Sequence, residues 1–533
     1  MDKRTLQLRL LGLIPVIFLF TLIGGSLFAI GSYSTNFDWS SVYIPPFFSK
    51  IVYFSLKQAF LSTLLSIALA IPVVWAFYKK RSSWTYKIFA RLFTFPIILS
   101  SLVVSNAIVL FYGRNGWFSY FLQQVGITND FSIYGLSGIL IGHLFFNLPL
   151  AVRLFLISLE SLPDSYEKTA IQLNLKGFNH FKTLLLPYIL RQIPSVSFFI
   201  FLLCFTSFTM VLILGGGPQS TTIEVEIFRN MNLGLDGFPF AIILSLLQMV
   251  ITLIILAVMY LLYKPIEETT NNINQPITKI YIGKIENYFS LLILLLCSLF
   301  IIFPLINLIV SSLNKEFINL LLRSVVQDAI LTSIKIAFFS SIFTCLLSLL
   351  GVMGKIPSIP LPKGNFLSPI FDNISYLIFI FSPIILSTGW FLLLYKYVNP
   401  ISIAIYMIII LNIAISLPIC GHILSPTWYS HINRHDKLIK SLDIGQFKRF
   451  FLFDLPYLKI ALSRCFAFAF IFSLGDLSVI AIWGNDELNS LPTLIQQNMG
   501  NYRNNTSAML SVILMLISFT VLLIFDKIYR KIN

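Results

Sequence analysis

Long apolar runs separated by short polar loops fill this chain of 533 residues. A helix needs about 20 consecutive apolar residues to cross the hydrocarbon core of a bilayer, and twelve runs meet this requirement. The loops between them leave no room for a separate soluble domain. We therefore predict an all-helical integral membrane protein, with spans near residues 8–31, 53–78, 88–112, 134–158, 193–214, 239–262, 288–312, 328–352, 369–395, 400–424, 460–483 and 506–526.

Basic residues are distributed unevenly among the loops. Every second loop is rich in Lys and Arg, as at Lys79, Lys80 and Arg81 after the second span. Cytoplasmic loops carry such an excess, so we predict a multi-pass protein of the cell (inner) membrane with both termini in the cytoplasm. The first apolar run exceeds the roughly 7–15 residues of a signal peptide, and we predict that it is retained as a span.

Composition supports the same class and excludes others. The chain is 57% hydrophobic and 11% charged, whereas a soluble domain carries roughly a quarter charged residues. The net charge of +15 is explained by the topology bias, so we expect no nucleic-acid partner. No phosphate-binding loop, metal cluster or nucleophile constellation is present in the sequence, and we expect a protein that is not an enzyme. The five cysteines all lie in apolar stretches, which favours buried thiols.

The two halves of the sequence resemble one another. Two loops that each end in Leu-Pro are 269 residues apart, since Pro187 corresponds to Pro456. Six spans per half is an even number, so both halves have the same orientation, and we predict two parallel six-helix repeats. The predicted modules are residues 1–262 and 288–533, joined by a cytoplasmic linker at 263–287.

Each repeated loop predicts a short amphipathic helix at the cytoplasmic face. In the first repeated loop (160–192), Ala170, Gly177 and Phe181 recur at helical spacing with basic residues between them. The second repeated loop (425–459) has a similar pattern. A helix of this kind could rest on lipid headgroups, or two copies could form a docking surface for a two-fold partner. Their matching places in the two halves favour docking.

These loops resemble the EAA coupling motif of ABC importer permeases, in which a helix with Glu-Ala-Ala, a Gly and a Leu-Pro sits in a groove of the ATPase. Both copies depart from this motif. Lys168 and Lys437 stand in the place of the Glu, and Asn174 and Asp443 stand in the place of the Gly. The resemblance implies a type I ABC importer permease (MetI-like) fold. It assigns ATPase coupling to Lys168, Thr169, Ala170, Asn174, Gly177 and Pro187, and to Lys437, Asp443, Gly445 and Pro456.

A narrower resemblance is to the permeases of bacterial thiamine and thiamine pyrophosphate ABC importers, which are single chains with two permease modules. It implies that thiamine or its phosphates move inward from a soluble substrate-binding protein, while two copies of a separate ATPase bind ATP and Mg²⁺. On this resemblance the chain itself binds no cofactor. The matching stretches are Gln172-Leu173-Asn174-Leu175-Lys176-Gly177, Leu214-Gly215-Gly216-Gly217-Pro218, Ser473-Leu474-Gly475-Asp476 and Trp483-Gly484-Asn485-Asp486.

Asp476 is the charged residue inside a predicted span that best fits a substrate pathway. A carboxylate in the bilayer is costly and usually faces a cavity or a partner. Asp476 could meet the positively charged thiazolium ring, or it could pair with Lys335, Arg464 or a backbone group to fix the helices. Its counterpart in the first half is Ser207.

Glycine-rich turns follow the fifth and eleventh predicted spans. They could form the outer gate of the pathway, or they could only turn the chain, which is the interpretation that we favour. The residues concerned are Gly215, Gly216, Gly484 and Asn485. A different pair, His143 and Asn147, stands one helical turn apart and predicts polar packing between helices rather than a ligand site.

Three other functions remain open from the sequence. The same ABC architecture could carry ferric iron or a polyamine. A secondary transporter with two six-span halves would need acidic residues for ion coupling in several spans, and only Asp476 fits that requirement well. A membrane scaffold without transport activity would leave the duplicated loops unexplained.

Overall fold

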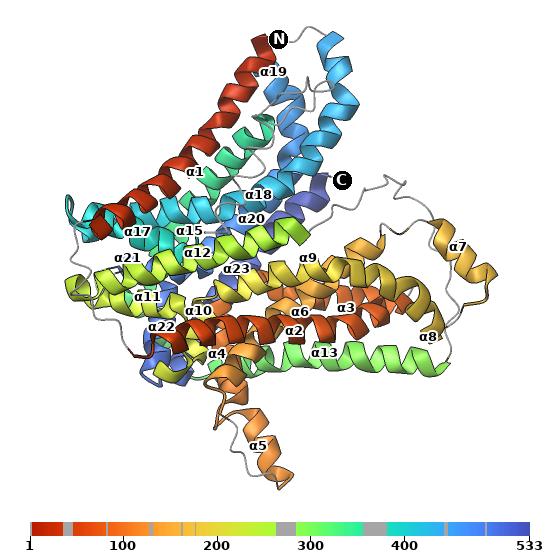
Figure 1. The fold of residues 1–533 in the computed structure, drawn as a ribbon, viewed down its shortest axis with the longest axis horizontal. Helices are drawn as coiled ribbons and strands as arrows, with labels where there is room; N and C mark the ends of the chain where they lie inside the picture. Colours follow the sequence, from red (N-terminus) through yellow and green to blue (C-terminus); the bar gives the residue numbers. More distant parts are fainter. Residues whose placement is uncertain are drawn as a thin grey trace.

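The computed structural model describes residues 3–35, 46–80, 84–126, 132–160, 162, 164–175, 177–262, 284–354, 381–441, 446–484 and 488–532. Every regular element in these ranges is helical (Figure 1). The first half contains α1 (Lys3–Thr35), α2 (Phe48–Lys80), α3 (Trp84–Thr94), α4 (Ser101–Tyr112), α5 (Trp117–Gln124), α6 (Leu136–Glu160), α7 (Asp164–Gln172), α8 (Gly177–His180), α9 (Leu186–Phe205), α10 (Thr209–Leu214), α11 (Ile223–Asn232) and α12 (Phe238–Leu262).

The second half contains a similar series of helices. These are α13 (Lys284–Ser312), α14 (Phe317–Leu321), α15 (Ser324–Gly354), α17 (Pro383–Tyr395), α18 (Pro400–Ser441), α19 (Gln446–Arg449), α20 (Leu455–Gly475), α21 (Ser478–Trp483), α22 (Leu491–Gly500) and α23 (Asn504–Ile532). The predicted linker at 263–287 lies outside the described residues except for its last turn, where α13 begins.

Ten helices in the described part of the chain are long and apolar enough to cross a membrane. Two of the twelve predicted spans are not among them. The span predicted at 88–112 is interrupted, because α3 passes into a 3₁₀ turn at Phe95–Ile98 and α4 starts anew with Ser100 as its N-cap. The span predicted at 369–395 is described only from residue 381, where it forms the end of α17.

The helices around the repeated loops match at a constant spacing. The helices α8, α9 and α10 begin 269 residues before α19, α20 and α21, respectively. A tertiary hydrogen bond also recurs: the Ile223 amide at the start of α11 donates to Ser55 Oγ of α2, and the Leu491 amide at the start of α22 donates to Ser333 Oγ of α15. In both halves, a serine of a long helix satisfies one of the free N–H groups at the start of a short helix.

The first helix of each half packs against the other half. Helix α1 contacts α15 and α17, whereas α13 contacts α2 and α4. Figure 1 shows α1 alongside the second-half helices and α13 alongside α2. The α1–α17 contact is close because Gly25 faces the Trp390 ring and Gly389 faces Ser26. Small residues let membrane helices approach closely in this way, and the exchange interlocks the two halves.

The helices form two bundles that converge at one end and diverge at the other (Figure 1). One bundle contains α1, α15, α17, α18 and α20, and the other contains α2, α6, α9 and α13. At the diverging end lie α7 and α8 of the first repeated loop and α19 of the second. Both ends of the chain lie on the same side of the molecule as the repeated loops. The distribution of basic residues predicted that the termini and these loops share one side of the membrane. That this side is the cytoplasmic one stays a prediction.

Candidate functional site

The first repeated loop contains two short helices, α7 and α8. On α7, Lys168 and Thr169 are exposed whereas Ala170 is buried, so the helix shows one face to solvent and one to the protein. Its last turn is closed by a hydrogen bond from the Leu175 amide to the Ala170 carbonyl. Of the predicted coupling residues, Lys168 and Thr169 are thus exposed on α7, while Ala170 packs the opposite face of this helix against the protein.

Asn174 ends α7 in a left-handed conformation, with φ of 51°. This conformation is the usual one for the residue that terminates a helix, and glycine adopts it most easily. Asn is one of the few other residues that tolerates it, because its short side chain can bond locally. The structure thus gives a physical reason why Asn can replace the Gly of the motif. Gly177, with φ of 60°, provides the second left-handed position.

Side chains from α2 and α13 hold the first repeated loop in place. The Tyr78 hydroxyl of α2 donates a hydrogen bond to Glu167 of α7. The Trp75 ring of α2 packs edge-on against Phe181, with centroids 6.3 Å apart. Glu286 of α13 lies directly against Gly177, where a side chain would clash with its carboxylate. The loop of the first half is therefore supported in part by the second half.

The second repeated loop is built differently from the predicted separate helix. Helix α18 continues from its span as far as Ser441, and Lys437 lies on this extension. The short helix expected in the loop 425–459 is therefore preceded by an extension of the span, and the short helix described there is α19 (Gln446–Arg449). Asp443 and Gly445 lie outside the described residues.

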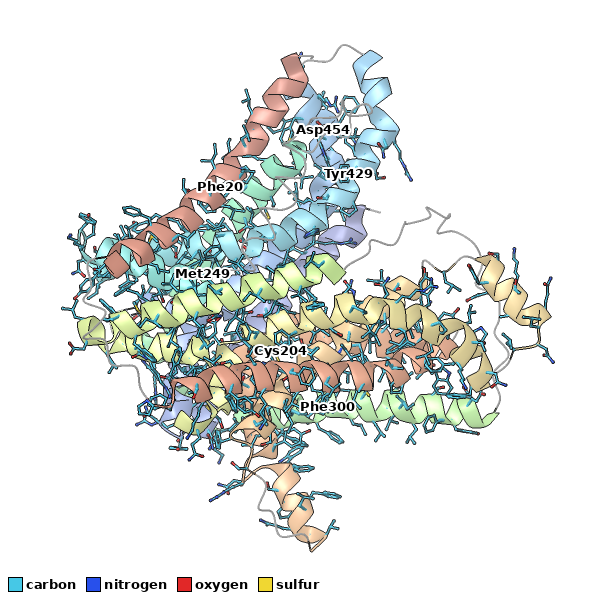
Figure 2. The ribbon with its side chains drawn as sticks, in the orientation of Figure 1. Phe20, Cys204, Met249, Phe300, Tyr429 and Asp454 are labelled. Carbon is cyan, nitrogen blue, oxygen red and sulfur yellow. The ribbon has the colours of Figure 1, made fainter. Side chains whose placement is uncertain are left out.

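A buried charged cluster anchors the second repeated loop. His431 Nε2 on α18 is 2.7 Å from Asp454 Oδ1, and Arg449 Nε is 3.4 Å from the same carboxylate. All three residues are at most 4% exposed. Asp454 lies in the upper bundle in Figure 2. The Tyr457 ring stacks on His431 with centroids 4.6 Å apart, so the cluster fixes the start of α20 to α18.

Both repeated loops join their spans through a short π-helical segment, at Phe181–Leu185 and Phe450–Asp454. Pro187 and Pro456 follow as the second residues of α9 and α20. A proline inside a helix lacks the N–H for one backbone bond, and here each proline stands two residues after a π-helical segment. Pro187 does not break the helix, because the chain stays helical from Gly177 to Phe205. The loop and the span thus form one rigid rod.

The predicted pathway residues Ser207 and Asp476 lie at two equivalent breaks. Helix α9 stops before Ser207 and resumes as α10, and α20 stops before Asp476 and resumes as α21. The Asp476 carboxylate accepts hydrogen bonds from the amides of Ser478 and Val479, at 3.0 and 3.3 Å. It therefore holds the start of α21, which corresponds to the backbone alternative for this residue. A pathway role stays a prediction.

The glycine-rich turn of the first half follows α10. Gly216 has φ of 69°, and an added side chain would clash with Tyr134. The Gly135 amide donates to the Leu214 carbonyl, which ties this turn to the start of α6. Gly215 and Gly484 end α10 and α21 in equivalent places. Asn485 lies outside the described residues.

Polar side chains between α2, α6 and α9 form a packed cluster, as predicted for His143 and Asn147. His143 Nδ1 is 2.9 Å from the Ser62 hydroxyl, and Asn147 Nδ2 donates to Cys204 Sγ at 3.0 Å. Gln58 donates to the Cys204 carbonyl. Cys204 lies deep within the molecule in Figure 2, so this cluster joins three helices of one half.

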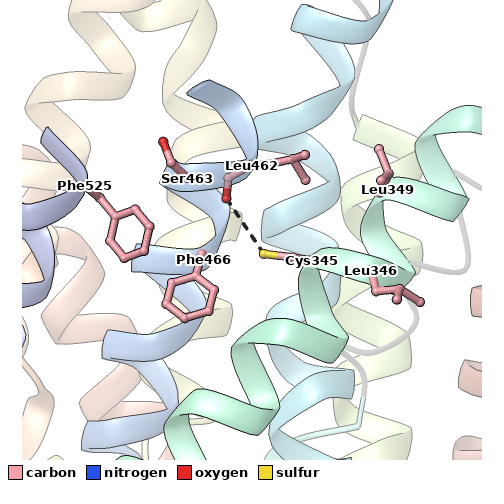
Figure 3. Close-up of a pocket in the computed structure, with 7 residues that line it drawn as sticks. All are labelled: Cys345, Leu346, Leu349, Leu462, Ser463, Phe466 and Phe525. Carbon is pink, nitrogen blue, oxygen red and sulfur yellow. Dashed lines mark hydrogen bonds between the residues drawn. The ribbon is translucent and has the colours of Figure 1, made fainter. Parts of the chain in front are cut away.

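A pocket of about 380 Å³ opens between α15, α20 and α23 (Figure 3). Its lining is apolar apart from Cys345 and Ser463, and the Cys345 thiol points to the Leu462 carbonyl. No carboxylate lines it, so it offers no negative charge to a cation.

Sequence reasoning missed a buried carboxylate on α11. Glu224 is 0% exposed and accepts a hydrogen bond from the Gln248 amide of α12. Hydropathy places α11 in a polar loop between two spans, which hid the residue. A charged residue within the run Thr221-Thr222-Ile223-Glu224-Val225 was the available signal, because apolar neighbours on both sides indicate burial.

The sequence is similar over nearly its whole length to permeases from several bacteria. It is 35% identical over 518 residues to the thiamine transport system permease protein ThiP of Brucella abortus (strain 2308), covering 97% of this chain and 94% of the relative. It is 33% identical to the ThiP proteins of Escherichia coli (strain K12), covering 92% and 91%, and of Haemophilus influenzae, covering 97% and 96%. No model of a known protein family matches the chain.

Proposed function

Since the chain belongs to the family of thiamine transport system permeases, we propose that it is the membrane-spanning permease of an ATP-driven importer for thiamine or its phosphates. One observation carries this conclusion: the similarity extends through both halves, from the first span to the last. The all-helical structure with ten span-length helices agrees with it. The relatives are permease subunits, so we expect catalysis on another subunit.

The finer architecture that we propose is a twelve-span, type I (MetI-like) permease made of two parallel modules, residues 1–262 and 288–533, joined by a linker at 263–287. Support comes from the matching starts of α8, α9 and α10 with α19, α20 and α21. The recurring bonds of Ser55 and Ser333 to the short helices add to it. Both termini would then be cytoplasmic.

The partners follow from the two repeated loops. Two copies of an ABC ATPase, each binding ATP and Mg²⁺, would dock on residues 160–192 and 425–459. A soluble binding protein would deliver the cargo at the opposite face. The exposed side chains of Lys168 and Thr169 support docking at the first loop. Because the two loops are anchored by different contacts, we expect the two ATPase contacts to differ.

Coupling would be mechanical. A push on α8 moves α9 as one rod, because the helix is continuous from Gly177 to Phe205. The rod ends at the break before Ser207, between α9 and α10. The same holds for α19, α20 and the break before Asp476. ATP-driven closure at the loops would therefore reach both breaks and switch access between the two sides.

Uptake of labelled thiamine into proteoliposomes tests the proposal. The chain is reconstituted with its ATPase subunit, and the binding protein is added outside with thiamine. We expect uptake that requires ATP inside and stops when the ATPase subunit is left out. Uptake without ATP would favour the secondary transporter. ATP-dependent uptake of ferric iron or a polyamine, but not of thiamine, would keep the ABC architecture and change the cargo.

A further inference from the structure

We propose that Glu224, together with the side-chain amide of Gln248, forms the site in the membrane domain that binds the positively charged ring of the cargo. This inference rests on the proposed function, because a thiazolium ring is the cation concerned. It assigns the cation to a residue on α11 rather than to Asp476 on α20.

The Glu224 carboxylate has an incomplete set of hydrogen bonds. Its side chain is fully buried, and one carboxylate oxygen accepts the bond from the Gln248 amide. The other oxygen, Oε2, has no hydrogen-bond partner among the described residues, and neither has Gln248 Oε1. A buried carboxylate without a partner is costly. A thiazolium ring has an alkylated nitrogen without an N–H group, so a buried carboxylate with an unpaired oxygen is suited to it by charge attraction rather than by hydrogen bonding.

Other acidic residues inside the described part of the chain have charged or backbone partners that Glu224 lacks. Glu226 pairs with Arg229 at 2.8 Å, and Asp454 pairs with His431 and Arg449. Asp476 uses its two oxygens to accept from backbone amides. Glu224 has no basic side chain as its partner in the described residues. Its charge is therefore free for a ligand.

Glu224 lies on a helix that contacts both halves of the molecule. Helix α11 contacts α12 of its own half and both α17 and α21 of the other half. The Ser382 side chain at the start of α17 lies beside the Glu224 carboxylate. Glu224 is thus at the interface between the halves, where a pathway enclosed by two repeats would run. Figure 2 labels Met249, the neighbour of Gln248, in the middle of the molecule between the two bundles.

Four aromatic rings close the same interface at the end away from the repeated loops. Phe238 of α12 lies 5.6 Å from the Tyr395 ring of α17, and Phe391 of α17 lies 5.4 Å from the Trp483 ring of α21. Gln248 is ten residues along α12 from Phe238, which is about 15 Å at the rise of an α-helix. Glu224 therefore lies about half a bilayer below the aromatic seal, the depth at which transporters bind their cargo.

The test measures thiamine transported per ATP hydrolysed by the complete reconstituted transporter. We expect Glu224→Gln to lower this ratio about 10- to 100-fold, because the cationic ring then loses its counter-charge in a desolvated site. Hydrolysis stimulated by the loaded binding protein should stay near the wild-type rate. The matched control is Glu226→Gln, which removes the same charge two residues further along α11 and should change the ratio less than about twofold.

The possible results distinguish a failure of the Glu224 site from a failure of the proposed function. An unchanged ratio in Glu224→Gln, with active wild type, overturns the Glu224 site and leaves the proposed function intact. Loss of both transport and hydrolysis in Glu224→Gln would indicate a structural role and also overturn the site. A wild-type complex that does not transport thiamine contradicts the proposed function itself.

A second measurement uses the wild-type chain, in case Glu224→Gln does not insert. A hydrophobic carbodiimide modifies carboxyl groups buried in membranes, and mass spectrometry locates the modified residue. We expect thiamine to protect Glu224 in the complete transporter, whereas a neutral sugar at the same concentration does not. Modification of Glu224 that is unaffected by thiamine would overturn the proposal.

Discussion

At the scale of single residues, the two repeated loops show how a motif can lose its signature residues and keep its geometry. Asn174 takes the left-handed conformation that the motif assigns to glycine. Asp454 has no counterpart in the motif, yet it joins the second loop to α18 through His431 and Arg449. Each loop therefore owes its position to contacts that differ between the two halves.

The conformation of Asn174 gives a prediction about coupling. Replacing Asn174 and Asp443 together by isoleucine should abolish thiamine uptake while the protein still inserts. A β-branched residue in the left-handed region costs about 1–2 kcal/mol, and the end of α7 must then unwind or shift. Asn174→Gly is the control, and it should transport like the wild type. Normal uptake by the double variant would contradict the coupling assignment.

The charged cluster of the second loop gives a prediction about stability. Asp454→Asn should lower the free energy of unfolding by about 3–5 kcal/mol, because it removes the buried negative charge that both Arg449 and His431 contact. Thermal unfolding of the detergent-solubilised protein measures the effect. Lys448→Gln changes an exposed charge beside the cluster and should shift stability by less than about 0.5 kcal/mol. Equal melting temperatures for the two variants would show that the cluster does not hold the loop.

At the scale of the helices, close packing of α1 against α17 is the contact that most depends on small residues. A Cβ atom on Gly389 would lie 2.7 Å from Ser26 Cα, and one on Gly25 would lie 2.6 Å from the Trp390 ring. The Trp390 indole also donates to the Leu22 carbonyl at 2.8 Å. These contacts have no space for an added methyl group.

We therefore predict that Gly389→Ala separates α1 from α17 and lowers stability by about 1–3 kcal/mol, as overpacking usually does. The control is Gly24→Ala, because a Cβ at Gly24 meets nothing within 4 Å. Thermal unfolding compares the two variants, and a cysteine cross-link between α1 and α17 reports their separation directly. Equal stability of both variants would contradict the packing argument.

Hydropathy predicted most of the long helices, because apolar length alone decides whether a helix can span a bilayer. It did not predict the breaks before Ser207 and Asp476. Thr206 precedes the first break and is not a helix breaker by type, whereas Gly475 at the corresponding place of the second half is a residue type that often ends helices. It also did not predict that α18 runs beyond the membrane, because polar residues after a span fit a loop equally well. These features depend on tertiary contacts rather than on local preference.

The candidate site was only partly predictable for a similar reason. The repeated loops were found because their spacing is visible in the sequence. Glu224 was missed because its burial depends on α17, which lies about 160 residues away along the chain. An apolar pattern shows which residues avoid water, but it does not show which helix from the other half will cover them.

At the scale of the whole molecule, the exchange of α1 and α13 makes each half a partner of the other. Because α1 and α13 each pack against the other half, we expect the two halves to stay together without the connection at 263–283. We predict that residues 1–262 and 263–533, co-expressed as separate chains, assemble and co-purify through a tag on one of them.

The control for this experiment is a first fragment that lacks residues 1–35 and therefore lacks α1. It removes the contacts to α15 and α17, and we expect much less co-purification and faster proteolysis of the second fragment. Equal recovery with and without α1 would mean that the exchange does not hold the halves together. Recovery of neither pair would show that the connection itself is required.

The exchange also has a consequence for how the protein is made. Helix α1 leaves the ribosome before its partners α15 and α17, which are synthesised about 300 residues later. At a synthesis rate of about 5–20 residues per second, α1 must wait in the bilayer for at least about 15 seconds. During that time its face at Gly25 and Ser26, which later packs against α17, is open to other newly made helices.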